Sequence, residues 1–376
     1  MSDERPQGGY EWLYGDDEPT RQAPRESSSQ LPPPQLPPPN LPPPGRRGAA
    51  SGGEPPAPRK RKTKRRVAGI LVLAWIVFMV AVPVWAWGKI NKVDAEPEGA
   101  RPGDQPGTTY LLVGSDSRRG LTKEEQKELS TGGDGGGRGR TDTIMLLHTG
   151  GGPSVLMSIP RDSMVDIPGY GTTKINAAYA YGGAKLLVQT IEQNTGIRVD
   201  DYVEVGFGGL VKVVDSLGGV EICPKEDMKD KDSGLNVKKG CQTADGSTAL
   251  AYSRNRHTYA NSDIGRVQAQ REVLGSIAGE AKSPWTVLNP LRYQKVASGA
   301  SGSLTIGENV GPISLGKFAL ALSAAMGGGG LNCTVPLQDL SVRWDANRAP
   351  EMFELIAKDE TDKIGALCTE DGFPKG

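Results

Sequence analysis

The chain has 376 residues and no net charge, because 44 basic side chains balance 44 acidic ones. Beyond residue 66 it carries 32 basic against 36 acidic side chains, a balance unlike that of a nucleic-acid-binding domain, so no nucleic-acid partner is expected. The only histidines, His148 and His257, lack ligand spacing, which disfavours a histidine-based zinc site and a Ser-His-Asp triad. We expect His148 to be a solvated strand end.

Residues 1–66 are polar and rich in proline, with LPPPQ, LPPPN and LPPPG following one another from Leu31 to Gly45. Such a segment has too little apolar surface to offset the entropy of ordering, so a disordered cytoplasmic tail with polyproline II tendency is expected. The sequence leaves two roles open for it, a plain spacer and a docking segment for an SH3-like or WW-like partner.

Residues 67–88 form an uncharged stretch of 22 residues, long enough to span a bilayer as a helix. Seven cations precede it within residues 59–66, and Trp85 and Trp87 stand at its far end, as in an interfacial belt. The positive-inside rule predicts a single-pass type II protein of the cell membrane, with residues 67–88 as an uncleaved signal anchor.

A polar linker is expected over residues 89–108, followed by an extracellular domain over residues 109–376. Its first strand, residues 110–114, runs into Asp116 and Arg118. A short helix over 121–129 and a glycine-rich loop over 132–139, a possible flap, come next.

Two runs of strand formers, residues 143–148 and 154–160, flank the turn TGGGP, a pattern typical of a β-hairpin. With the turn centred on Gly151, Arg140 would face Asp162 and Asp142 would face Pro160. These charges, together with Arg161, would therefore gather at one end of the hairpin.

If strand 110–114 lies antiparallel to strand 143–148, Asp116 and Arg118 reach the same sheet edge. Arginine forks bind phosphate oxygens, and aspartates are ligands for Mg²⁺. This edge therefore indicates a phosphate-handling site, and a structural salt-bridge cluster is the alternative.

The rest of the chain alternates strands and helices, which indicates an α/β or α+β layered domain. The predicted strands are residues 199–207, 220–222 and 333–337, and the predicted helices are residues 184–194, 208–217, 263–281, 291–298, 315–326 and 349–357.

On helix 263–281, Asp263, Arg266 and Gln270 share one polar face. Arg254 and Arg256 precede this helix, where the helix dipole favours an anion. A bound anion would explain these cations, and an ordinary solvated face is the alternative.

Four cysteines on the exported side indicate two disulfides. Three pairings are possible, of which local closure favours Cys223–Cys241 and Cys333–Cys368.

Six motifs appear in the order typical of one family, and the chain resembles the LytR-CpsA-Psr family of bacterial cell-wall glycopolymer ligases. They are YLLVGSDSR (110–118), GRTDTIML (139–146), SIPRDS (158–163), KINAAYAYGG (174–183), GGV (218–220), and SRNR with DIGRVQAQR (253–271).

The resemblance implies a three-layer α/β/α domain with a central mixed sheet and an apolar pocket for a polyprenyl chain. It also implies transfer of a glycopolymer phosphate from a polyprenyl diphosphate carrier to a peptidoglycan sugar hydroxyl, forming a phosphodiester in cell-wall assembly. The polymer, for example teichoic acid, arabinogalactan or capsule, stays open.

The resemblance also implies roles for individual residues. Asp116 and Asp142 would hold Mg²⁺, and the catalytic set would be Arg140, Arg161, Asp142 and Asp263. The diphosphate would bind Arg118, Arg254, Arg256, Arg266 and Gln270. The chain departs from the family pattern at Ala269, where an arginine is common, and at Arg271, where a glutamine is common.

Two alternative functions remain. With water as acceptor, the same site would be a polyprenyl diphosphate pyrophosphatase. Without turnover, the chain would be a membrane-anchored wall-polymer binder or envelope regulator.

Overall fold

The predicted membrane segment forms one continuous helix, α1 (Lys60–Trp87). The computed structural model describes residues 60–116, 139, 141–230, 233–255 and 262–374. Within these, Arg65–Trp87 is the one helix long and apolar enough to cross a membrane, with a mean hydropathy of 2.7. Its apolar side chains, among them Leu71, Val80 and Val84, are mostly exposed, as expected of a helix with lipid around it.

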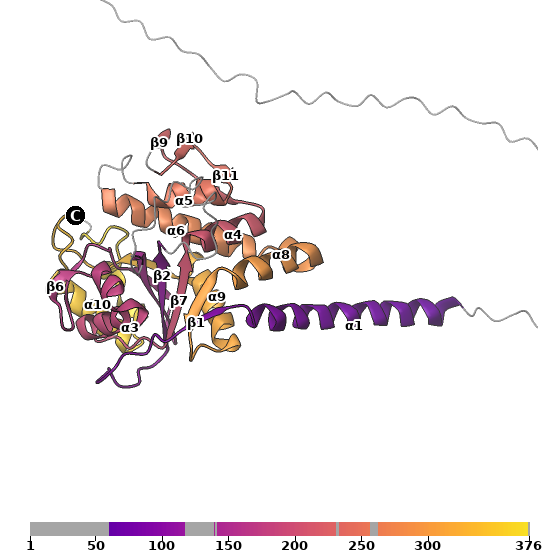
Figure 1. Cartoon of the computed structure of the whole chain (residues 1–376), viewed down its shortest axis with the longest axis horizontal. Helices are drawn as coiled ribbons and strands as arrows, with labels where there is room; N and C mark the ends of the chain where they lie inside the picture. The colour runs from indigo at the N-terminus through magenta and orange to yellow at the C-terminus, as the bar shows by residue number, and fades with distance from the viewer. Residues whose placement is uncertain (1–59, 117–138, 140, 231–232, 256–261, 375–376) are drawn as a thin grey trace, which may run out of the picture. The chain divides into compact units, whose positions relative to one another are not determined.

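The centre of the domain is a seven-stranded mixed sheet (Figure 1) in the order β1-β12-β7-β2-β3-β4-β13. The pairs β1–β12, β2–β7 and β4–β13 are parallel, and the remaining neighbours are antiparallel. The strands are β1 (Asn91–Val93), β2 (Thr108–Ser115), β3 (Thr141–Thr149), β4 (Val155–Ser158), β7 (Asp201–Gly206), β12 (Leu304–Gly307) and β13 (Leu331–Thr334).

Helices cover both faces of this sheet, which is why its central strands are apolar at consecutive positions. On β2, Leu111 and Val113 pack with α3 (Asn176–Thr195) and α10 (Arg348–Ala357). Tyr110 and Leu112 face the other way and pack with α9 (Pro312–Met326). The predicted three-layer α/β/α domain is therefore confirmed.

A third apolar cluster lies beside the sheet. Its side chains come from most of the remaining helices and from the three-residue strands. Its helices are α4 (Phe207–Leu217), α5 (Gly246–Arg254), α6 (Ser262–Ala281) and α8 (Pro290–Ser301), and α7 (Pro284–Leu288) links the last two. Its two small sheets pair β8 (Val220–Ile222) with β11 (Gln242–Ala244), and β9 (Met228–Asp230) with β10 (Leu235–Val237).

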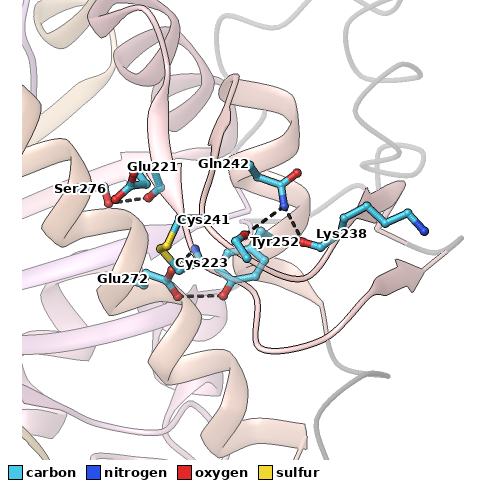
Figure 2. The surroundings of a disulfide bond; sticks show 9 residues. Glu221, Cys223, Lys238, Cys241, Gln242, Tyr252, Glu272 and Ser276 are labelled. Atoms are coloured by element: carbon cyan, nitrogen blue, oxygen red, sulfur yellow. Dashed lines mark hydrogen bonds between the residues drawn. A yellow bond between two sulfur atoms is a disulfide. The ribbon is translucent and has the colours of Figure 1, made fainter. Parts of the chain in front are cut away.

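The two favoured disulfides are both present. Cys223–Cys241 closes the loop that carries β9 and β10, and Cys333–Cys368 ties the C-terminal segment to β13. Figure 2 shows the first bond against α6, where Glu272 accepts hydrogen bonds from the Cys223 backbone N–H at 2.5 Å and the Tyr252 hydroxyl at 2.8 Å. The disulfide is thus anchored by the helix that also reaches the candidate site.

The predicted hairpin is present, but its register differs by one residue. Met145 pairs with Ser158, so the turn is centred between Gly151 and Gly152 and Asp142 comes opposite Arg161. The C-terminal region holds the turn, because Asp359 accepts a 2.7 Å hydrogen bond from the Gly151 N–H. The sequence pattern could not show this long-range contact.

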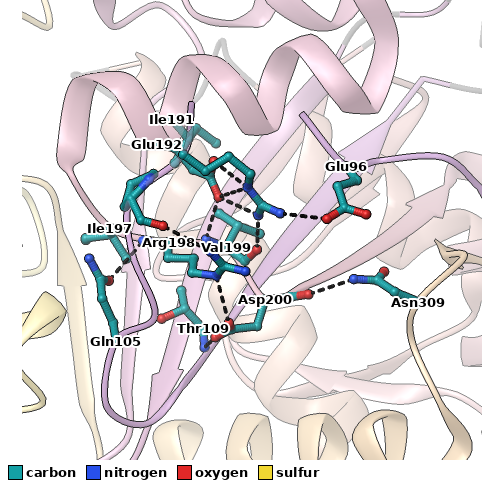
Figure 3. A network of polar contacts seen from close by, with 12 residues as sticks. Glu96, Gln105, Thr109, Ile191, Glu192, Ile197, Arg198, Val199, Asp200 and Asn309 are labelled. Carbon is teal, nitrogen blue, oxygen red and sulfur yellow. Dashed lines mark hydrogen bonds and ion pairs between the residues drawn. The ribbon is translucent and has the colours of Figure 1, made fainter. Parts of the chain in front are cut away.

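The prediction of a polar linker over residues 89–108 is wrong, because this segment belongs to the fold. It supplies the edge strand β1, and Arg101 pairs with the buried Glu192 of α3 at 2.7 Å while donating to the Val199 carbonyl at 2.8 Å. Figure 3 shows Glu192 beside the neighbouring network, in which Asp200 accepts a 2.8 Å hydrogen bond from the Thr109 N–H. Folded structure therefore begins near Asn91.

Helix α3 consists of two helical stretches joined at Gly183, whose φ of 68° and ψ of −153° are not helical. The helix predicted over 184–194 is the second stretch, and the first stretch, which begins at Asn176, was not predicted. The expectation for His148 is corrected. His148 is buried rather than solvated, and its ring contacts the Thr109 hydroxyl at 2.9 Å and Asp359 at 3.1 Å.

The hairpin of β5 (Met164–Ile167) and β6 (Gly171–Lys174) was not predicted. Each strand is four residues long. β5 alternates exposed and buried positions, with Val165 and Ile167 in the core, whereas no position of β6 is buried. The hydrophobic pattern is therefore confined to one very short strand. The helix predicted over 121–129 lies outside the described residues.

Candidate functional site

One edge of the central sheet is formed by the end of β2 and the start of β3. The two strands are antiparallel as predicted, and a register shift between Gly114 and Ser115 precedes the pair Ser115–Thr141. Gly114 permits this close approach, because a Cβ there would lie 2.8 Å from the facing threonine side chain. Asp116 follows β2 directly and Asp142 is the second residue of β3, so neighbouring strand ends supply two carboxylates.

Arg161 lies in the turn after β4 and reaches across to β3. Its Nη1 donates to Oδ1 of Asp142 at 2.5 Å, with side-chain exposures of 14% and 22%. Asp162 approaches the Arg161 Nε at 3.8 Å and pairs with Lys174 at 3.1 Å. The partial burial of Arg161 and Asp142 strengthens their attraction relative to a fully exposed pair.

The backbone around Arg161 is held by the segment that begins α3. The Asn176 N–H donates to the Arg161 carbonyl at 3.2 Å, and the Ile175 N–H donates to the Ser163 carbonyl at 2.9 Å. Ile175 is itself fully buried in the core. The IPRD and KIN sequences therefore form one rigid unit that fixes where the guanidinium starts.

Helix α6 approaches the same strand from the other side. The Gln270 amide donates to the Asp142 carbonyl at 3.5 Å, and Gln270 is buried. Arg266 lies one turn earlier on α6 and is only 2% exposed. A buried guanidinium is costly unless anions or acceptors surround it, and Arg266 places such a charge one helical turn from the residue that contacts Asp142.

Arg254 is the last residue of α5 and its guanidinium lies over the ring of Phe207, 4.9 Å from the centroid. This cation–π contact orients a long side chain that is otherwise flexible. Asn255, which follows it, is fully buried, so the backbone at this point is also fixed.

The two positions that depart from the family pattern have structural roles. Ala269 is buried in the third apolar cluster. Arg271 is buried, donates to Ser158 at 3.0 Å and to the Glu370 carbonyl at 3.1 Å, and also contacts Thr334. Burial lowers the pKa of Arg271 to about 10. Arg271 therefore ties β4 and β13 to the C-terminal segment.

Sequence reasoning missed Glu204, a buried carboxylate on β7. It accepts hydrogen bonds from the hydroxyls of Ser115 at 2.7 Å, Tyr179 at 2.9 Å and Tyr202 at 2.8 Å. Ser115 immediately precedes Asp116, so this network fixes the end of β2. The available signal was one acidic residue inside the otherwise apolar strand YVEV.

Several predicted site residues lie outside the described part of the chain. These are Arg118, Arg140 and Arg256, together with the side chain of Asp263, whose backbone lies in the first turn of α6. Most of the loop 120–139 is outside it as well.

The carboxylates of Asp116 and Asp142 fit a magnesium ion by their chemistry. Mg²⁺ is usually held in such sites by one or two carboxylates, with phosphate oxygens and water completing the shell. Within the described residues, the one group of three possible metal ligands lies elsewhere and consists of Glu221, Cys223 and Cys241. Its two sulfurs form a disulfide (Figure 2), which leaves no thiolate to bind a metal.

A site of this kind can bind and polarise a phosphate group. It combines a held guanidinium, carboxylates at two strand ends and a buried arginine on a helix that contacts the same strand. Such a set stabilises charge on phosphate oxygens and needs no protein nucleophile.

The chain matches the sequence model of the LytR_cpsA_psr family over residues 88–319. It is 45% identical over 295 residues to the probable cell wall biosynthesis protein LcpB of Corynebacterium glutamicum, covering 76% of this chain and 69% of that protein. Residues 88–319 run from β1 into the first half of α9 and include all the described site residues.

Two solved structures share the fold. The LytR-Csp2A-Psr enzyme from Actinomyces oris superposes with a TM-score of 0.58 at 19% identity, covering 71% of this chain and 96% of that one. TagT bound to LI-WTA superposes with a TM-score of 0.51 at 25% identity, covering 72% of this chain and 97% of that one. With the family match and the LcpB similarity, the conclusion is that this chain belongs to the LytR-CpsA-Psr family of cell-wall biosynthesis proteins.

Proposed function

We propose that this protein transfers a glycopolymer phosphate from a polyprenyl diphosphate carrier to a sugar hydroxyl of peptidoglycan. The observation that carries the proposal is the Arg161–Asp142 pair, held at 2.5 Å at the sheet edge with Gln270 and the buried Arg266 on the helix beside it. The likeness to LcpB and to TagT bound to LI-WTA supports a cell-wall glycopolymer as the ligand class.

In this reaction the acceptor oxygen bonds to the glycan-linked phosphorus. The bond from that phosphorus to the bridging oxygen breaks, and polyprenyl phosphate leaves with the electron pair. Arg161 donates hydrogen bonds to phosphate oxygens as negative charge shifts onto the leaving group. Asp142 keeps the Arg161 guanidinium in place. Arg266 supplies a fixed positive charge, and Arg140, Arg118, Arg254 and Arg256 complete the proposed diphosphate site.

The acceptor hydroxyl must lose its proton as it attacks. A carboxylate not engaged with the metal is suited to accept it. Asp162 and Asp263 are the two candidates. Asp162 lies between Arg161 and Lys174, so it is next to the group that binds the phosphate.

Asp116 and Asp142 would hold Mg²⁺, which when bound neutralises charge on the diphosphate. The first requirement on the protein is to keep the two strand ends together. The β2–β3 pairing and the hydrogen bonds to Glu204 meet that requirement.

We further propose a single-pass type II anchor with the catalytic domain outside the cell. The cation cluster of residues 59–66 precedes the apolar span, and such clusters remain in the cytoplasm. The two disulfides of the domain support an oxidising compartment.

The test uses the full chain in detergent with Mg²⁺, a glycan-linked polyprenyl diphosphate and a peptidoglycan oligomer, and mass spectrometry of the products. A phosphodiester conjugate from the wild type and from Arg343→Ala, but not from Arg161→Ala, is expected. Arg343 is a matched control because it pairs with Asp339 on the surface, far along the chain from the site.

Each other outcome contradicts part of the proposal. Cleaved lipid without conjugate would identify a polyprenyl diphosphate pyrophosphatase. Tight lipid binding without turnover would identify a wall-polymer binder or envelope regulator.

A further inference from the structure

Among the described residues outside α1, the largest group of exposed apolar side chains lies on α7, α8 and α9. Large hydrophobic residues in this region are 62–76% exposed at five positions, namely Trp285, Leu288, Leu291, Ile313 and Leu320. Water-facing surfaces rarely place so many large apolar side chains on neighbouring helices of the sequence, and such a surface usually contacts a partner or a membrane. We call these five residues the apolar face.

The region around the apolar face carries a small excess of positive charge. Residues 280–338 contain four cations, Lys282, Arg292, Lys295 and Lys317, and two carboxylates, Glu280 and Glu308. Arg292 forms an ion pair with Glu280 at 2.9 Å, so the excess comes from the lysines. Anionic phospholipid headgroups attract such a surface. A surface that combines large apolar side chains with an excess of lysines matches the boundary between lipid tails and headgroups.

The connection to α1 keeps this region near the bilayer. Helix α1 ends at Trp87 and β1 begins at Asn91, a separation of at most roughly 14 Å in extended chain. Asn91 pairs with Thr305 of β12, and β12 lies between α8 and α9 in the sequence. The short connection between α1 and β1 therefore keeps the C-terminal end of α8 close to the end of the apolar span.

The side chains at the end of α1 indicate the depth of the bilayer surface. Lys89 lies 4.0 Å from the centroid of the Trp85 ring, and Lys92 lies 5.5 Å from that of Trp87. Tryptophan and lysine together are typical of the interface between lipid and water. This interface is thus at about residues 85–92.

Direct contacts join α8 to α1 below that level. The Tyr293 hydroxyl donates to the Met79 carbonyl at 3.2 Å, and the rings of Tyr293 and Phe78 lie 6.2 Å apart. Met79 precedes Trp87 by eight residues, which is about 12 Å along a helix. Tyr293 therefore lies at a depth where α1 is surrounded by lipid tails, since each leaflet contributes about 15 Å of hydrocarbon.

We propose that α7, α8 and the first half of α9 are inserted into the bilayer leaflet at the C-terminal end of α1, with the apolar face against the lipid tails. Leu291 is two residues from Tyr293, and α7 immediately precedes α8, so both are carried to the same depth. The domain is then held by two contacts, the span and the apolar face, which limits its rotation over the membrane. The candidate site is thereby kept at a constant height above a lipid-borne substrate.

The test uses the full chain in nanodiscs of neutral and anionic phospholipid. Single cysteines at Leu288→Cys and Leu291→Cys carry an environment-sensitive fluorophore, and the four native cysteines do not react because they form disulfides. Leu340→Cys is the matched control, since Leu340 is 69% exposed and lies outside the apolar face. A quencher attached to the lipid tails and aqueous iodide report the two surroundings.

We expect blue-shifted emission and several-fold stronger quenching by the lipid-borne quencher at 288 and 291 than at 340. Equal exposure to iodide at all three positions would overturn the proposal. Shielding from iodide without quenching by the lipid would also overturn it and would show that protein, such as a second copy of this chain, covers the face. Leu288→Glu combined with Leu291→Glu should leave the unfolding midpoint unchanged while raising iodide access to a fluorophore at Ile313→Cys.

Discussion

Arg161 and Asp142, which come from the turn after β4 and the start of β3, are joined by a 2.5 Å hydrogen bond within a charge chain that continues to Asp162 and Lys174. In the proposed reaction the two residues would serve one phosphate group as a unit, so their substitutions should not be additive. Arg161→Ala and Asp142→Ala should each lower the transfer rate by orders of magnitude. The double variant should transfer no more slowly than the slower of the two single variants.

This cycle is measured as initial rates of conjugate formation, with unfolding midpoints as a check on folding. Arg343→Ala and Asp339→Ala form the parallel cycle on an exposed pair. Losses that multiply in the Arg161–Asp142 cycle would show that the two residues act independently.

Removal of magnesium should abolish transfer reversibly. A chelator takes away the charge that offsets the diphosphate, while the fold keeps its own ion pairs. Transfer should return on addition of Mg²⁺, and Asp116→Asn should need a higher Mg²⁺ concentration for half-maximal rate. Undiminished transfer in excess chelator would rule out a metal at these carboxylates.

Glu204→Gln should alter the response to Mg²⁺ as well as the stability. The amide offers one acceptor oxygen where the carboxylate accepts three hydroxyl hydrogen bonds, so the end of β2 beside Asp116 loses support. The measurements are the unfolding midpoint and the Mg²⁺ concentration for half-maximal transfer.

Glu272→Gln is the control for this experiment. Glu272 also accepts two hydrogen bonds, but it supports the Cys223–Cys241 disulfide (Figure 2) rather than a strand end of the site. Glu272→Gln should lower the unfolding midpoint and leave the Mg²⁺ concentration for half-maximal transfer unchanged. The same pattern from Glu204→Gln would mean that Glu204 is purely structural.

Loss of Arg101 should destabilise the domain strongly. Its partner Glu192 is 3% exposed, and a buried carboxylate without its cation costs about 3–5 kcal/mol. The hydrogen bond to Glu192 raises the pKa of Arg101, so the pair is intact at neutral pH. Chemical unfolding of Arg101→Ala should show this loss, whereas Lys358→Ala, at an exposed pair with Glu354, should change little.

The contact between Asp359 and His148 should make stability depend on acid pH. Burial raises the pKa of Asp359, but hydrogen bonds from the Gly151 N–H and from His148 outweigh it and hold the pKa below the usual value. The carboxylate therefore stabilises the fold above the pKa of the unfolded chain, and this contribution is lost as pH falls through the folded-state pKa.

Asp359→Asn should accordingly lower the unfolding midpoint near pH 7 and have a smaller effect in acid, once the pH has fallen below the folded-state pKa and the wild-type side chain is also neutral. If the difference in unfolding midpoint between the wild type and Asp359→Asn does not become smaller in acid, the interaction does not depend on the carboxylate charge.

Local sequence patterns were sufficient for the span, the alternation of strands and helices, and the two disulfides. A run of 22 uncharged residues has one stable solution in lipid, and the strand YLLV between polar turns must be buried on both faces. The charged motifs at the strand ends also pointed to the edge where Asp142 and Arg161 meet, although their register was wrong by one residue.

Residues far apart in the chain decided the remainder. The turn register depends on Asp359, and the end of β2 depends on Glu204. The strand β1 joins the sheet by pairing with β12, and the segment after it is held by Arg101 and Glu192. The placement of α8 beside α1 depends on the contact of Tyr293 with Met79. The sequence by itself determined which segments are apolar, extended, helical or charged, because these properties depend on neighbouring residues. Only the tertiary structure decided which buried charges and turns meet. A charged or polar group that loses its water on burial needs a partner inside the protein, and that partner can come from any part of the chain that packs beside it.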